Sequence, residues 1–108
     1  MSENGKHIYE CMFILDARSA KKDGDAVQEG LTKILEKHGV EVAGVHLWGE
    51  RRMAYEIRRQ KKGYYVLMHV KADPEGIDEL KRDLGLHEPL MRHFFLRIEE
   101  VPENFEFP

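Results

Sequence analysis

The chain has 108 residues, of which 42% are hydrophobic and 34% are charged, and its formal net charge is −3. This length suits one domain with a single core, and no apolar run reaches the roughly 18 residues that a membrane span needs. A lone cysteine, Cys11, excludes an intramolecular disulfide. Because the chain also starts without the pattern of a signal peptide, we expect a cytoplasmic protein.

The charges are distributed unevenly along the chain. Residues Arg51–Lys71 contain seven bases and one acid, so this stretch carries +6 whereas the remainder carries −9. Such a division suggests that one face of the molecule binds an anionic partner. A basic but merely solvated hairpin is the alternative, and charge alone does not decide between the two.

The first half of the chain predicts a strand, a helix and a second strand. Residues 7–15 are rich in β-branched and aromatic side chains on both faces, which indicates a strand. An apolar stripe at helical spacing follows, and the helix is expected to start at Asp23 or Asp25 as N-cap and to end at Gly39. Residues 40–48 alternate as a strand. The members of the helical stripe are Val27, Leu31, Ile34 and Leu35.

The alternation of the second strand changes parity at Ala43-Gly44, which predicts a β-bulge. Extended chain is expected to continue as far as Arg59. Gln60–Gly63 then forms the predicted hairpin turn, with Gly63 at a positive φ. Residues 64–71 are the third predicted strand.

A second helix and a fourth strand complete the pattern. Asp73 and Pro74 are expected as N-cap and first helical position, and Gly85 as the end of the helix. Residues 90–98 are the fourth strand. The buried stripe of the second helix comprises Ile77, Leu80 and Leu84.

The predicted fold is α+β with the order β-α-β-β-α-β, the ferredoxin-like split β-α-β arrangement of a four-stranded antiparallel sheet with two helices on one face. It occupies residues 7–99, between a flexible N-terminal segment (1–6) and an acidic, flexible C-terminal tail (100–108). No element in the sequence covers the other face of the sheet. That face is apolar, so it needs a partner chain, a stacked ligand or the tails over it.

Catalysis has little support in the sequence, and we predict that the protein is not an enzyme. No nucleophile, phosphate-loop or dinucleotide motif is present. Cys11 lies among apolar neighbours, which favours core packing. The six histidines lack metal-ligand spacing, so neither a metal nor a cofactor is expected. Arg18 follows the first strand, where acyl-phosphate hydrolases of this fold hold a phosphate, but no glycine-rich loop accompanies it.

Nucleic-acid binding fits the basic stretch better. Arginine and lysine on a hairpin can follow a phosphate backbone, and the interleaved Tyr55, Tyr64 and Trp48 could stack on bases or simply pack the hairpin. The third strand begins Lys62-Gly63-Tyr64, as in an RNA-recognition motif, but the later aromatic positions of that motif do not match.

Two runs of the chain, Trp48–Ile57 and Lys62–Tyr65, resemble the family of ribosomal protein six of the bacterial small subunit. Agreement extends to Tyr9-Glu10, to Glu79–Leu84 and to Leu90–His93, so the resemblance covers about residues 7–99. It implies a structural protein that binds the central domain of small-subunit ribosomal RNA. It also implies a heterodimer with a small basic protein, ribosomal protein eighteen, which suits the acidic remainder of this chain.

The resemblance assigns most of the expected RNA-binding or partner-binding residues, and the charge pattern adds Lys61 and Lys62. Some positions depart from the family pattern: Glu56 stands where proline is common, Met53 replaces a usual leucine, and Lys6 is the one basic residue kept before the first strand. The alternative is a ferredoxin-like regulatory homodimer that binds a small ligand. The complete set of expected site residues is Arg51, Arg52, Tyr55, Arg58, Lys61, Lys62 and Arg92.

Overall fold

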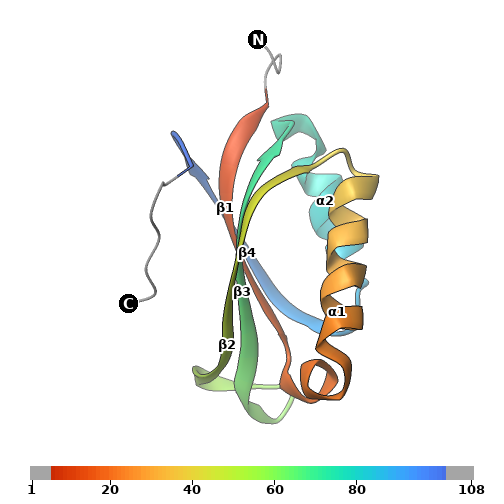
Figure 1. Cartoon of the computed structure of the whole chain (residues 1–108), viewed down its shortest axis with the longest axis vertical. Helices are drawn as coiled ribbons and strands as arrows, with labels where there is room; N and C mark the ends of the chain where they lie inside the picture. Colours follow the sequence, from red (N-terminus) through yellow and green to blue (C-terminus); the bar gives the residue numbers. More distant parts are fainter. Residues whose placement is uncertain (1–5, 102–108) are drawn as a thin grey trace.

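The computed structural model describes residues 6–101, which form a four-stranded antiparallel sheet with two helices on one face (Figure 1). The strands are β1 (His7–Asp16), β2 (Glu41–Ile57), β3 (Gln60–Ala72) and β4 (Leu90–Ile98), in the order β2-β3-β1-β4. The helices are α1 (Ala17–Lys37) and α2 (Ile77–Leu84), and a 3₁₀ turn, η1 (Pro74–Gly76), precedes α2. The predicted ferredoxin-like fold is confirmed.

The main core lies between the helices and the sheet. Alternation along β1 turns Cys11 and Phe13 to this side, where they join Leu31 and Leu35 of α1 and Leu84 of α2 in one cluster of fully buried side chains. Burial raises the pKa of the Cys11 thiol to about 12. The thiol is therefore protonated at neutral pH and acts as a packing group, as its apolar context predicted.

Helix α1 begins earlier than the sequence predicted. Its first residue is Ala17, and its N-cap is Asp16, whose carboxylate accepts hydrogen bonds from two backbone N–H groups at 2.9 and 3.2 Å. Asp23 interrupts the helix with φ −158° and ψ 80°, and accepts a hydrogen bond from the N–H of Ala26 at 3.1 Å. Asp23 thus caps the main segment, as predicted. The preceding segment, residues 17–22, has no apolar stripe and was missed for that reason.

The hairpin between β2 and β3 turns at Arg58 and Arg59, so the predicted turn at Gln60–Gly63 is wrong. The two arginines have φ of 53° and 64°, the left-handed region that two-residue hairpin turns require. Gly63 lies inside β3 and does not have a positive φ. A Cβ there would be 2.6 Å from Cγ2 of Ile14. Close packing against β1, rather than turn geometry, explains this glycine.

The predicted bulge and the predicted helix caps are found in the structure, whereas the start of the second helix is not where the sequence predicted it. The register of β2 against β3 shifts between Val42 and Gly44, which is the predicted bulge, and Gly39 follows α1 with φ 72°. Asp73 caps η1 by accepting a backbone hydrogen bond at 2.9 Å. The α-helix itself starts later than expected, at Ile77.

The sheet face opposite the helices, called the open face below, is partly covered by the hairpin itself. The end of β2 brings Met53 and Ile57 against Ile14 and Met91, and these four side chains form a second, smaller buried cluster. The expectation that no element covers this face is therefore wrong at the hairpin end. The rest of the face is open and carries polar as well as apolar side chains, among them Glu10 and His69, which lie 3.1 Å apart. Its large exposed apolar side chains are Tyr55, Phe94 and Leu96.

The predicted terminal segments, residues 1–6 and 100–108, lie largely outside the described residues, because residues 1–5 and 102–108 are not described. Within residues 6–101, no helix combines the length and the apolar character needed to cross a membrane. In the same range, no three histidine, cysteine or acidic side chains gather where they could hold a metal ion.

Candidate nucleic-acid interface

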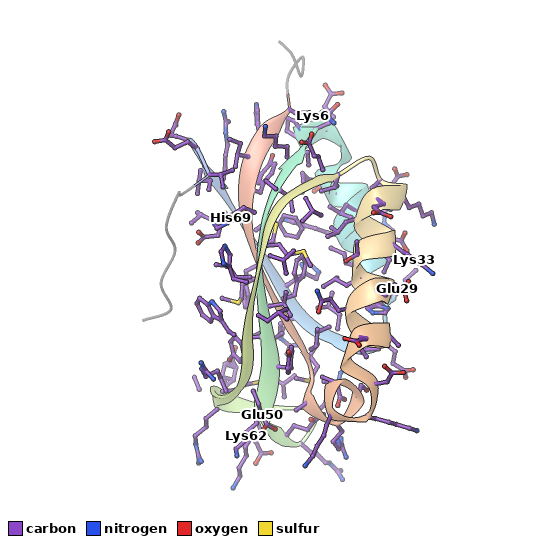
Figure 2. The ribbon with its side chains drawn as sticks, viewed as in Figure 1. Lys6, Glu29, Lys33, Glu50, Lys62 and His69 are labelled. Carbon is purple, nitrogen blue, oxygen red and sulfur yellow. The ribbon has the colours of Figure 1, made fainter. Side chains whose placement is uncertain are left out.

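Basic side chains from two elements gather at one end of the molecule, called the basic end below. Figure 1 shows that the start of α1 and the tip of the β2–β3 hairpin lie at this end, and Figure 2 places Lys62 and Glu50 there. All the basic side chains of this end are exposed. They are Arg18, Lys21 and Lys22 from α1 and Arg51, Arg52, Arg58, Arg59, Lys61 and Lys62 from the hairpin.

The register of the hairpin sets like charges opposite each other. Arg52 of β2 pairs with Lys62 of β3, next to the pair of Arg51 with Gly63. Within residues 6–101, neither Arg52 nor Lys62 has a carboxylate within 4.0 Å. Like charges in directly opposed positions destabilise a sheet. An anion bound at this end would remove that repulsion, so the arrangement suits a polyanionic ligand.

Arg58 has a structural contact as well as a place in the basic end. Its Nη1 donates to the carbonyl of Glu88 at 2.7 Å, and its Nη2 donates to the carbonyl of Leu90 at 3.2 Å. These hydrogen bonds join the hairpin turn to the segment that enters β4. The guanidinium of Arg58 therefore fixes the position of the turn. If Arg58 contacts RNA as expected, it does so with a side chain that these hydrogen bonds already hold in place.

Tyr55 and Arg92, also expected from the sequence, lie on the open face. Both line a hollow of about 270 Å³ whose walls include Met12, Tyr65 and Phe94. Tyr55 is 66% exposed, and the guanidinium of Arg92 donates to the carbonyl of Met91 at 2.8 Å. The structure thus divides the expected site residues into a cationic group at the basic end and a pair, Tyr55 and Arg92, on the open face.

Sequence reasoning missed part of this surface. Arg59 occupies the turn, and Lys21 lies on the helical segment that no periodic pattern had predicted. The sequence offers Arg18 only as a residue of a phosphate loop, whereas in the structure it lies in the first turn of α1 after the Asp16 cap. Of the two roles that the sequence leaves open for Tyr64, base stacking and packing, the structure shows packing, against the main core.

Comparison with known proteins supplies the family. The model of the family described as ribosomal protein S6 matches residues 8–97. The small ribosomal subunit protein bS6 of Gluconacetobacter diazotrophicus is 38% identical over 96 residues, which cover 89% of this chain but 60% of that relative. Its counterpart in Anaplasma phagocytophilum is 34% identical over 97 residues, covering 90% and 89% of the two chains.

A solved structure agrees with these relatives. The crystal structure of 30S ribosomal protein S6 from Thermotoga maritima matches with a TM-score of 0.76 at 26% identity, and the match covers 86% of this chain and 88% of that one. All three proteins are named as ribosomal proteins rather than enzymes, in agreement with the non-catalytic prediction. Because the family match spans all four strands and both helices, this chain belongs to the ribosomal protein S6 family.

Proposed function

We propose that this protein is a structural component of the small ribosomal subunit and binds the central domain of small-subunit ribosomal RNA through its basic end. One observation carries the proposal: exposed cations from both hairpin strands gather at one end, and the opposed Arg52 and Lys62 among them have no carboxylate within 4.0 Å in the described part of the chain. Phosphate groups are the natural counter-charges for such a strip. Family membership supports the same role. The protein would then reside on cytoplasmic ribosomes.

The second part of the proposal is a heterodimer with a small basic protein, ribosomal protein eighteen. The chain outside Arg51–Lys71 carries −9, which suits a basic partner. The open face supports a protein contact as well, because Phe94 and Leu96 are 55% and 60% exposed there. Exposed aromatic and aliphatic side chains on one face are typical of an interaction surface. In this arrangement the open face binds protein while the basic end binds RNA.

Removing the two adjacent arginines of β2 tests the RNA contact. Arg51→Ala combined with Arg52→Ala should weaken binding to a central-domain RNA fragment and lower the slope of log affinity against log salt by about 1.4–1.8. A salt-titrated filter-binding assay measures both quantities. The matched control is Lys33→Ala with Arg82→Ala, which removes two exposed charges from the helix layer. Unchanged affinity and an unchanged salt slope in the hairpin variant would remove these arginines from the interface.

A further inference from the structure

A groove separates the first turn of α1 from the tip of the hairpin, and bases line both of its walls. Its volume is about 450 Å³; Arg18 lines it from the helix, and Arg59, Lys61 and Lys62 line it from the hairpin. Glu50 is the one acidic residue in this lining. A smaller hollow of about 210 Å³ shares Ala17 and Glu50 with the groove and extends it to Lys21. The two hollows, together called the strip below, share these lining residues and lie at the basic end, which is the lower end in Figure 2.

The two walls are held together by one carboxylate. Asp16 accepts hydrogen bonds from the N–H groups of Arg18 and Ser19 through Oδ1, at 2.9 and 3.2 Å. Its Oδ2 accepts a hydrogen bond from Nε2 of Gln60 at 2.9 Å. The start of the helix is therefore fixed relative to the hairpin, and the groove exists before any ligand binds.

The helical segment that forms one wall adds nothing buried to the core. All the buried residues of α1, namely Val27, Leu31 and Leu35, lie after the kink at Asp23. Residues 17–22 before the kink present three exposed bases. Burial of apolar side chains therefore does not account for this segment, and its three exposed bases are available to an anion.

The chemistry of the groove selects the kind of anion. Within residues 6–101, no carboxylate lies within 4.0 Å of Arg18, Lys21, Arg59, Lys61 or Lys62. All five side chains are exposed, so each contact with a single phosphate would be weak in water. A polyanion gains from every contact at once, because each neutralised phosphate releases a condensed counterion. The strip therefore fits a phosphodiester backbone better than a small phosphate compound.

We propose that this groove binds the RNA phosphodiester backbone, and that Arg18 and Lys21 of α1 extend the interface beyond the hairpin. The inference rests on the proposed RNA-binding function and adds a second element to it. RNA phosphates lie between the helix and the hairpin, in contact with bases from both sides. The contacts are made through charge, so they position the protein without reading the base sequence.

The test replaces the basic side chains of the helix wall and leaves the hairpin unchanged. Arg18→Gln with Lys21→Gln is compared with the wild-type chain and with Lys33→Gln plus Arg82→Gln, all with the central-domain RNA fragment and the basic partner protein present. In the groove variant, the slope of log affinity against log salt should be smaller in magnitude by about 1.4–1.8. The ratio of wild-type affinity to variant affinity should therefore fall about tenfold between 50 and 200 mM salt. Arg18→Lys with wild-type Lys21 should bind like the wild type, because it keeps the charge. The control pair should leave the slope unchanged.

The outcomes separate this inference from the proposed function. If the wild type binds and the groove variant binds equally well, the groove is excluded from the interface while the function stands. If groove variant and control lose affinity equally, net charge rather than the groove is responsible, and the inference fails. Saturable binding of inorganic phosphate that the variant loses, with RNA binding intact, would assign the groove to a small anion. No RNA binding by the wild type would overturn the proposed function itself.

Discussion

At the scale of single residues, Asp16 connects the two elements that form the basic end. It caps α1 and also accepts a hydrogen bond from the side chain of Gln60, so it links two elements that are far apart in sequence. Burial alone raises the pKa of its carboxyl, but the hydrogen bonds from Gln60 and from two backbone N–H groups outweigh burial, and the pKa lies below its ordinary value. The ionised carboxylate is thus the form that the folded state favours.

We expect Asp16→Ala to lower the free energy of unfolding by about 1–2 kcal/mol at pH 7, because a helix cap and a side-chain hydrogen bond are lost. Since the folded pKa is lowered, the unfolded chain takes up the proton first as the pH falls. The stabilisation is full above about pH 4 and is lost as the pH drops through the folded pKa. Urea unfolding across pH 2–7 should show the two proteins converging in acid; a constant difference would contradict this account.

At the scale of elements, the β2–β3 hairpin is the feature on which the site depends. Its turn places two arginines, Arg58 and Arg59, at positive φ, where glycine and asparagine are usual. Arg58 donates hydrogen bonds to the carbonyls of Glu88 and of Leu90, the first residue of β4, and these offset the cost. Arg59 has no such bond among the described residues and lines the groove instead. Backbone strain tends to persist at functional positions, so the strained backbone of Arg59 fits a role of its side chain in binding.

Arg59→Gly should therefore raise the free energy of unfolding by about 0.5–1 kcal/mol while weakening RNA binding, because it relieves the backbone and removes a cation. Chemical denaturation and the salt-titrated RNA assay measure the two effects on the same preparation. Arg97→Gly serves as the control, since Arg97 is exposed in extended β4 and outside the basic end, and glycine there should only destabilise. Equal destabilisation by both variants would show that the turn is not strained.

How far the sequence predicts these elements depends on the kind of signal each one carries. The strands and the main segment of α1 have apolar periodicity, so their existence and order follow from the sequence. The first segment of α1 has only small and polar residues, and a hydrogen bond between Asp16 and the distant Gln60 holds it in place. Gly63 resembled a turn glycine, yet its role depends on the side chain of Ile14 on a neighbouring strand. Such contacts have no local signature.

At the scale of the whole molecule, charge and apolar surface lie in different places. The excess of bases in Arg51–Lys71 predicted a cationic surface, and folding adds Arg18 and Lys21 to it from α1. The second face of the sheet was predicted to be apolar, and its exposed Phe94 and Leu96 agree with this, but Glu10 and His69 also lie on it. The hairpin covers part of this face through Met53 and Ile57. We therefore infer that RNA and protein partner bind side by side, each on the surface that suits its chemistry.

The most direct test of this account is a salt-titrated binding measurement on the full chain. The ligand is a central-domain fragment of small-subunit ribosomal RNA, with and without the basic partner protein. We expect specific binding that weakens steeply with salt and strengthens markedly when the partner is added. Absence of specific binding under both conditions would contradict the account, and would leave the basic end a solvated surface with no RNA to neutralise it.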